Sequence, residues 1–295
     1  MSINLESRIA DMEIVILGIC RDVAMDLESD VERLRDSFND FKKVHFRFVE
    51  SDSSDSTVEI LHRLTEKIPN FQFRDLGKLQ DEISNRFERL AYCRNICIEI
   101  LDVDPALKNC SYVAVTDLDG TNALLTRDAV LSCWQRDDWD ACMANQAAPY
   151  YDIFALRHPD WSPDDCWKFE SQLLRSGVNP IVAREKAIYS RMIKIEPNSE
   201  WIPVDSAFGG LAIYKRHLFE GVSYISEIAN QGDIAEHVTI HLQMRAKGAK
   251  LFINPALINL GWNIHNVPQK LNKRLKRIVK RILWVLLPIV RKKVL

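Results

Sequence analysis

The sequence lacks the features that mark small secreted proteins and proteins that span membranes. Its seven cysteines are odd in number and include no C-x-x-C pair, which argues against a disulfide framework and against a structural zinc site. No apolar run reaches the ~18–20 residues that cross a bilayer. Acidic residues precede the first apolar stretch and no small-residue cleavage site follows it, so we expect no signal peptide. These absences predict a cytoplasmic protein with free thiols.

The composition is that of an ordinary globular protein. Of the 295 residues, 47% are hydrophobic and 27% are charged, which excludes a disordered or collagen-like chain. A chain of this length can bury the core of one large domain. We find no internal repeat and no low-complexity segment.

Charge is distributed unevenly along the chain. Residues 1–236 carry all 41 acidic residues and 26 of the 39 basic ones, a balance of −15. Residues 237–295 carry the other 13 basic residues and no acid, a balance of +13. A basic tail on an acidic body predicts an anionic partner for the tail, either membrane phospholipid or nucleic acid.

Strand-like and helix-like patterns alternate through the first 120 residues. Because parallel strands are joined by helical crossovers, this alternation predicts an α/β fold with a mostly parallel sheet. In the second half we expect a strand after a glycine turn, then a helix and a further strand. The expected strands are 13–20, 44–49, 71–76, 111–116, 208–216 and 250–255, and the expected helices are 24–43, 57–68, 79–101 and 234–248.

Polar clusters follow three of the expected strands, at Arg21-Asp22, Glu50-Ser51-Asp52 and Asp117-x-Asp119. Ligands of parallel sheets bind at the carboxyl ends of the strands. Two carboxylates that converge in a turn at Gly120 offer hard oxygen ligands for Mg²⁺ or Mn²⁺. The alternative is a solvated loop whose aspartates cap a helix.

Arginines precede this acidic turn in the segment RFERLAYCRN. Arg86 and Arg89 are about one helical turn apart, and Arg94 comes shortly before the Asp117 strand. Guanidinium groups suit phosphate and carboxylate. The alternative is helical pairing with Glu82 and Glu88 on a solvated face.

Seven motifs in this order resemble one family. They are VESDSSD, RLAYCRN, DLDG, YYDIFALRH, FGGLAIYKR, EHV and LFINPALIN, spread over about residues 12–262. Together they resemble the fungal capsule-associated (cryptococcal-type) α-1,3-mannosyltransferases and their bacterial relatives, which are GT-A glycosyltransferases. The sequence departs from that pattern at Glu236-His237, where the wider fold often has Glu-Asp. It also shows no N-terminal membrane anchor, and residues 264–295 have no recognised counterpart.

The resemblance implies a Rossmann-like GT-A domain over residues 1–263, with a nucleotide-sugar half at about 12–122 and an acceptor half at about 123–263. It implies a mannosyltransferase that uses GDP-mannose with retention, bound Mn²⁺ or Mg²⁺, and a glycan or lipid-linked acceptor. Asp119 and Glu236 would be catalytic, with Glu236 either a general base or a group that orients a sugar. Asp117, Asp119 and His265 would hold the metal. The nucleotide sugar would be bound by Arg21, Glu50, Asp52, Arg86, Arg94, Asp117, Gly209 and Gly210.

The segment 150–167 is rich in aromatic and acidic residues, a composition that suits carbohydrate. Its acceptor-site candidates are Asp152, Arg157, Asp164 and Asp165. The alternative is a long loop held in place by its own aromatics. His237 and His241 have a spacing that permits shared metal binding, but a polar helix face is the preferred interpretation because no third ligand adjoins them.

Residues 268–295 combine ten Lys and Arg residues with apolar residues at helical spacing and contain no acid. This pattern predicts a basic amphipathic C-terminal helix on the inner face of the plasma membrane, without spanning it. Nucleic acid would not need the apolar run ILWVLLPIV, so we expect no nucleic-acid partner. The alternative is a helix packed on the catalytic domain.

Two other functions compete with glycosyl transfer. A nucleotidyltransferase of similar fold usually carries a glycine-rich phosphate loop near its N-terminus, and the segment ICRDVAMD has no glycine. A non-enzymatic, membrane-tethered module that binds carbohydrate or nucleotide is the second alternative.

Overall fold

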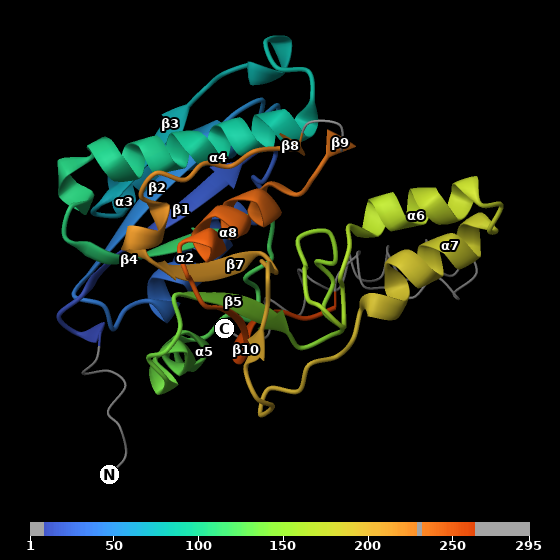
Figure 1. Ribbon diagram of the computed structural model, residues 1–295. Helices are drawn as coiled ribbons and strands as arrows, with labels where there is room; N and C mark the ends of the chain where they lie inside the picture. The colour runs from blue at the N-terminus through green and yellow to red at the C-terminus, as the bar shows by residue number, and fades with distance from the viewer. Residues whose placement is uncertain (1–8, 229–231, 263–295) are drawn as a thin grey trace.

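Eight strands form one central sheet in the computed structural model, which describes residues 9–228 and 232–262 (Figure 1). Their order is β3-β2-β1-β4-β7-β5-β10-β6. The sheet is mostly parallel, but β7 runs antiparallel to β4 and β5, and β6 runs antiparallel to β10. The strands are β1 (Glu13–Cys20), β2 (Lys43–Glu50), β3 (Phe71–Asp75), β4 (Cys110–Thr116), β5 (Ala141–Gln146), β6 (Ile202–Pro203), β7 (Leu211–Lys215) and β10 (Leu251–Leu260); β8 (Glu227–Ile228) pairs separately with β9 (Gly232–Asp233).

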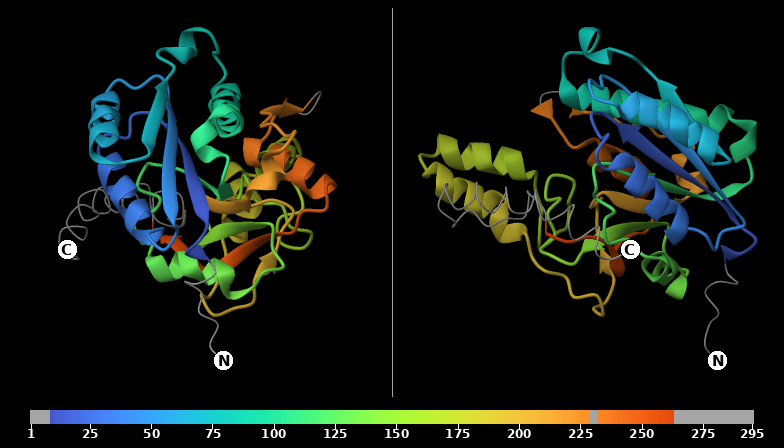
Figure 2. Two further views of the ribbon diagram at one scale, coloured as in Figure 1. Left: turned by 90° about the vertical axis from the view of Figure 1, so that its left-hand side faces the viewer. Right: turned by 180° about the vertical axis from the view of Figure 1, so that it is seen from behind.

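Helices cover both faces of the sheet (Figure 2). In β1, Ile14 and Ile16 pack into one core with α2 and α3, and Val15 and Leu17 pack into a second core with α4 and α8. Burial on both faces explains why this strand is a continuous apolar run rather than an alternating one. The helices are α2 (Leu27–Ser37), α3 (Thr57–Lys67), α4 (Arg86–Val103), α5 (Arg127–Leu131), α6 (Cys166–Arg175), α7 (Pro180–Ala187) and α8 (Glu236–Ala246).

The expected fold class, an α/β protein with a mostly parallel sheet flanked by helices, is confirmed. All four expected helices are shorter than predicted, and two of them differ by more than three residues at one end. The helix expected at 79–101 begins only at Arg86, because the Asn85 side chain accepts the Phe87 amide N–H at 2.8 Å and caps the helix there. The helix expected at 24–43 ends at Ser37.

A helical hairpin made of α6 and α7 extends from the body (Figures 1 and 2). It follows the long loop at 147–165. Within residues 9–228 and 232–262, no helix is long and apolar enough to cross a membrane. The expected C-terminal helix at 268–295 and the metal candidate His265 lie outside the described residues.

Candidate active site

A cavity of about 370 Å³ opens at the carboxyl ends of β1, β2 and β4. This volume lies within the range of small-molecule sites, about 300–1,000 Å³. Its walls come from both halves of the chain: the strand ends, α4, the loop at 151–155 and the start of α8. Of the predicted site residues, Arg21, Asp52, Arg86, Arg94, Asp117, Asp119, Asp152 and Glu236 line it.

The turn after β4 brings Asp117 and Asp119 to the cavity. Gly120 has a φ of +85°, the left-handed conformation that glycine adopts most readily. Its N–H donates to the Asp30 carboxylate on α2 at 2.7 Å, and the Asn122 amide donates to the Asp117 carbonyl at 2.9 Å. The side chains of Asp30 and Asn122 therefore fix the shape of the turn. The turn itself is where Gly120 led us to expect one.

Arg94 links two acids across the cavity floor. Its Nε donates to Glu236 at 2.9 Å, and its Nη2 donates to Asp117 at 3.0 Å. The guanidinium carbon lies 5.2 Å from the Phe208 ring centroid and 5.9 Å from that of Tyr224. Burial opposes the charge, but the two carboxylates outweigh it and raise the pKa of Arg94. The Nη1 atom is buried and has no hydrogen-bond partner among the described residues.

The carboxylates on the acidic side of the cavity repel one another. Burial raises the pKa of Asp117 to about 7, Arg94 opposes the shift, and Asp119, Asp152 and Glu236 add to it. Carboxylates that repel one another in a partly buried site favour a bound cation. Asp117 and Asp119 therefore fit a divalent metal by the chemistry of their oxygen donors.

The glycine loop before β7 positions the acidic turn. Gly209 and Gly210 have φ values of +70° and +85°. The Gly209 N–H donates to Asp152 at 3.0 Å, and the Gly210 carbonyl accepts the Asp117 N–H at 2.9 Å. A Cβ at Gly209 would lie 2.9 Å from the Ala144 carbonyl. The two glycines are outside the cavity lining, and the close contacts that they make are with protein. Their approach to a sugar, which the resemblance implies, stays a prediction.

Asp52 occupies the far end of the cavity, after β2. Its φ is +65°, a conformation that Asp and Asn tolerate better than most residues. Its carboxylate accepts the Gln80 N–H at 2.8 Å and lies 3.5 Å from Nε of Arg89. Arg21 is exposed and donates to the Gln80 side chain at 3.2 Å.

Two of the predicted nucleotide-site residues occupy peripheral positions. Glu50 is buried beneath the cavity, outside its lining, where it accepts the Ser53 N–H at 2.9 Å. It therefore supports the loop that carries Asp52. Arg86 lines the rim of the cavity and is exposed.

The acceptor candidates divide into two groups. Asp152 lines the cavity, whereas Arg157, Asp164 and Asp165 do not. Arg157 pairs with Asp165 at 2.6 Å, and Asp164 pairs with Arg191 at 2.6 Å. Asp165 also caps α6 by accepting the Trp167 N–H at 3.0 Å. In these contacts the three residues fasten their own loop, in line with the alternative considered for this segment.

His237 and His241 are both buried, contrary to the expected polar helix face. His241 bonds to Ser206 and Tyr214, both at 2.9 Å, so both of its ring nitrogens have protein partners. Burial lowers its pKa to about 3. His237 lines the cavity and stacks on Phe208, with ring centroids 3.7 Å apart.

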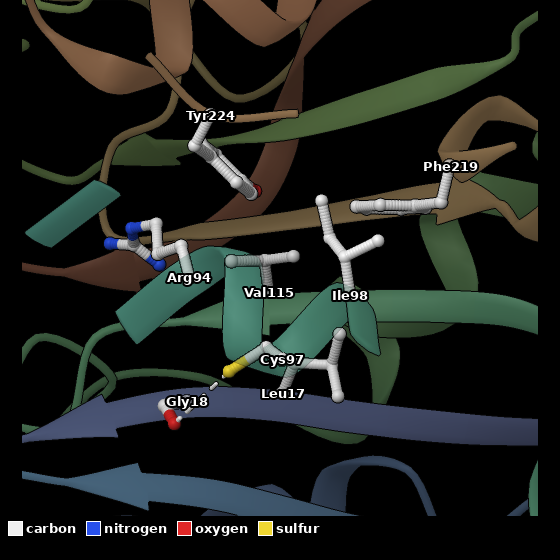
Figure 3. Close-up of a pocket in the computed structure, with 8 residues that line it drawn as sticks. All are labelled: Leu17, Gly18, Arg94, Cys97, Ile98, Val115, Phe219 and Tyr224. Carbon is white, nitrogen blue, oxygen red and sulfur yellow. Dashed lines mark hydrogen bonds between the residues drawn. The ribbon is translucent and has the colours of Figure 1, made fainter. Parts of the chain in front are cut away.

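A small apolar void of about 10 Å³ lies beside Arg94 (Figure 3). Leu17, Val115, Cys97 and Ile98 are among its lining residues. Its volume is about that of one water probe. The void therefore belongs to the packing around Arg94 and is too small for an organic ligand.

A separate group of possible metal ligands, Glu13, His45 and Cys110, lies at the opposite ends of β1, β2 and β4. His45 Nε2 is 3.5 Å from the Glu13 carboxylate. Lys43 and Arg47 add positive charge beside His45, which disfavours a cation. This cluster cannot serve the cavity, since the length of the strands separates the two.

Sequence reasoning missed several lining residues. The predicted site does not include Arg89, Ser51, Tyr151 or Phe208, all of which line the cavity. Phe208 carried a signal, because it directly precedes the glycine pair. Tyr151 carried none beyond its place in an aromatic-rich loop.

The fold and the cavity define an α/β protein with a ligand site that combines buried arginine with clustered carboxylates. No family model and no curated protein matches the chain. Solved structures similar to it include a mannosyltransferase from Pyrobaculum calidifontis in complex with GDP-Man and Mn²⁺, at 16% identity and a TM-score of 0.48, covering 91% of this chain and 61% of that one. Two others are TarS from S. aureus in complex with UDP-GlcNAc (10%, TM-score 0.44, 82% and 56%) and glucosyl-3-phosphoglycerate synthase from Mycobacterium tuberculosis in complex with UDP (14%, TM-score 0.42, 94% and 82%).

The chain spans less than two thirds of the length of the first two of these structures. With every score below 0.5, the likenesses assign neither a family nor an activity.

Proposed function

We propose that the protein is a metal-dependent glycosyltransferase of the GT-A type that takes its sugar from a nucleotide donor. The observation that carries the proposal is the bridge from Asp117 through Arg94 to Glu236 in a cavity at the carboxyl ends of parallel strands. Such a cavity offers positive charge to a diphosphate and carboxylates to a metal and to sugar hydroxyls.

In this proposal, Asp117 and Asp119 hold Mn²⁺ or Mg²⁺, which neutralises charge on the departing diphosphate. Arg94, whose buried Nη1 has no hydrogen-bond partner within the described part of the chain, donates to a phosphate or donor-sugar oxygen. Arg86 at the rim adds positive charge. Arg21 and Asp52 bind the nucleoside, because a carboxylate accepts hydrogen bonds from base and ribose donors.

Glu236 would orient a sugar rather than remove a proton. Its carboxylate already accepts a hydrogen bond from Arg94 at 2.9 Å, which fixes the direction of the side chain. Asp152 would contribute to the acceptor side from the opposite wall. GDP-mannose as the donor, retention of configuration, and a glycan or lipid-linked acceptor in surface polysaccharide synthesis follow from the family resemblance alone.

Residues 268–295 would hold the enzyme on an anionic membrane at the inner face of the plasma membrane. This part of the proposal rests on sequence, on ten basic residues without an acid and on apolar helical spacing. Truncation after Asn266 should release the protein from anionic vesicles and preserve activity on a soluble acceptor analogue. Equal vesicle binding by both forms would refute the anchor.

The decisive experiment is a hydrolysis assay on a panel of nucleotide sugars with and without Mn²⁺. A glycosyltransferase should release nucleoside diphosphate from one donor only when metal is present. A nucleotidyltransferase would leave the nucleotide sugars intact until pyrophosphate is added, and would then convert one of them to nucleoside triphosphate and sugar 1-phosphate. A binding module would retain the nucleotide sugar intact, and turnover in EDTA would exclude the metal.

A further inference from the structure

The turn of the α6–α7 hairpin presents apolar side chains to solvent. We define the hairpin tip as residues 171–182, the end of α6, the connecting turn and the first residues of α7. Leu174, Ile181 and Val182 are 42%, 69% and 44% exposed. Because α6 ends at Arg175 and α7 begins at Pro180, these three residues lie close to the turn of the hairpin. Figure 1 shows this turn at the end of the hairpin that is away from the body.

The charge of the tip is unlike that of the body. Residues 171–182, SQLLRSGVNPIV, contain one arginine and no acid. By contrast, residues 1–236 average more than one acid in every six residues. Just beyond the tip, Lys168 and Lys186 lie on the two helices beside Glu185, and Glu170 is paired with Arg184. The hairpin therefore ends in an apolar, weakly basic point on an acidic protein.

The base of the hairpin is held firmly. Arg184 of α7 pairs with Glu170 of α6, and its guanidinium carbon lies 4.7 Å from the Trp167 ring centroid. Arg191 pairs with Asp164 at 2.6 Å below the hairpin. These contacts tie the two helices to each other and to the loop beneath, so the tip is carried on a stiff support.

We propose that the hairpin tip inserts into the interfacial region of an anionic lipid bilayer. The transfer of exposed aliphatic side chains out of water lowers the free energy, and basic residues next to them are attracted to anionic headgroups. A protein partner fits the tip less well. A standard interface takes about 20–30 residues from each side, whereas the tip has twelve.

The hairpin also adjoins the candidate active site. Phe154 lines the cavity, and its ring centroid lies 6.4 Å from that of Trp167 in α6. A tip seated in lipid would therefore bring the cavity near the membrane surface, where a lipid-linked acceptor would be presented. Only this last consequence rests on the proposed function, and lipid insertion by the tip does not.

Cysteine labelling of the full-length protein tests insertion directly. All seven native cysteines are buried, so a cysteine introduced at Ile181 can be labelled selectively with an environment-sensitive fluorophore. Leu242→Cys on α8, at a residue 58% exposed, is the matched control. With vesicles of phosphatidylglycerol and phosphatidylcholine, the emission at position 181 should shift to the blue and that at position 242 should not.

Several results would overturn the proposal. They are no shift at position 181, equal shifts at both positions, or a shift that depends on protein concentration without vesicles, which would indicate self-association. Blue shifts of equal size on purely zwitterionic vesicles would remove the electrostatic part of the proposal and contradict it as stated.

Ile181→Asp supplies a second measurement. The change is compatible with the fold, because an acid is favourable in the first turn of a helix and Asn179 caps the Ile181 N–H at 2.9 Å. Vesicle partitioning should fall about tenfold or more, since burial of such a side chain is lost. Leu242→Asp should change it little. Donor hydrolysis in solution should be unaffected by either change, so an inactive wild type would reject the proposed function and leave the membrane result standing.

Discussion

Nε of Arg94 lies 2.9 Å from Oε1 of Glu236, although 142 residues separate them in the chain. The contact joins α4 in the first half of the protein to the start of α8 in the second. Because both side chains are buried, neither charge can exchange its partner for bulk water. The same ion pair therefore shapes the floor of the cavity and stabilises the packing of α8 against α4.

Glu236→Gln should disturb the shape of the cavity and lower the stability of the domain. The neutral amide keeps the size of the side chain and loses the charge-assisted bond, at a cost of about 2 kcal/mol in the free energy of unfolding. Denaturant unfolding measures this change. Glu28→Gln removes an exposed partner of Lys67 at 2.9 Å and should cost less than about 0.5 kcal/mol. Similar losses in both variants would show that the Arg94 bridge has no special weight.

Asp119→Asn should lower sugar transfer by at least ~10²-fold, because a group that stabilises charge in the transition state is lost. The change retains the shape of the side chain and its neighbour Thr121, whose hydroxyl donates to Asp119 at 2.7 Å. Asp128→Asn, at an exposed side chain of α5, is the matched control and should be fully active. Steady-state assays with varied Mn²⁺ make the comparison. Full activity of the Asp119 variant, or of the wild type in EDTA, would contradict the metal assignment.

Asp117→Asn should stabilise the metal-free protein at neutral pH. The native pKa of about 7 exceeds the ~3.9 of an unfolded chain. The native state therefore binds more protons between about pH 4 and pH 7, and the free energy of unfolding falls as the pH rises through that window. The variant has no carboxyl group at this position, so its free energy of unfolding should not show this fall.

We expect the variant to exceed the wild type by about 1 kcal/mol at pH 8, a value reduced because a third of the Asp117 side chain is exposed. Thermal unfolding from pH 4 to pH 8 provides the test. Saturating Mn²⁺ should stabilise the wild type more than the variant. Parallel stability curves for the two proteins would exclude the raised pKa.

Asp52→Asn should reduce nucleotide affinity about tenfold with the fold intact. Asparagine tolerates the left-handed backbone at this position, where alanine would be strained, so the change isolates the charge. Losing one charge-assisted hydrogen bond corresponds to about that factor. Titration calorimetry with GDP and UDP measures it, and Asp75→Asn, outside the cavity lining, is the control. Unchanged affinity for both nucleotides would place the nucleoside elsewhere.

The sequence was most informative where a local rule applied. Apolar runs located β1, and alternation of strand and helix located the parallel sheet, because backbone periodicity is a local property. The Asp117-x-Asp119-Gly120 turn was likewise predicted, since glycine permits the required conformation. The predicted start of α4 was wrong although a local signal marks the boundary, because Asn85 is a residue type that commonly caps helices.

Long-range contacts account for what the sequence could not supply. No sequence signal near Gly209 predicts that its N–H donates to Asp152, and none near Asp117 predicts that its N–H donates to the Gly210 carbonyl. Such partners depend on how β7 inserts between β4 and β5. The aromatic-rich loop therefore suggested carbohydrate binding throughout, although three of its four candidates fasten the loop itself.

The position of β7 also bears on how the protein is made. Ribosomes release the chain from its N-terminus, so β1 to β4 emerge long before Gly210 can cover Asp117 or Glu236 can reach Arg94. Until β7 pairs with β4, the Arg94 guanidinium and the Asp117–Gly120 turn are exposed to water at the edge of a partly formed sheet. A nascent chain should acquire nucleotide affinity in a single late step, after α8 has left the exit tunnel, and truncated translation products that end before Glu236 should need chaperones to stay in solution.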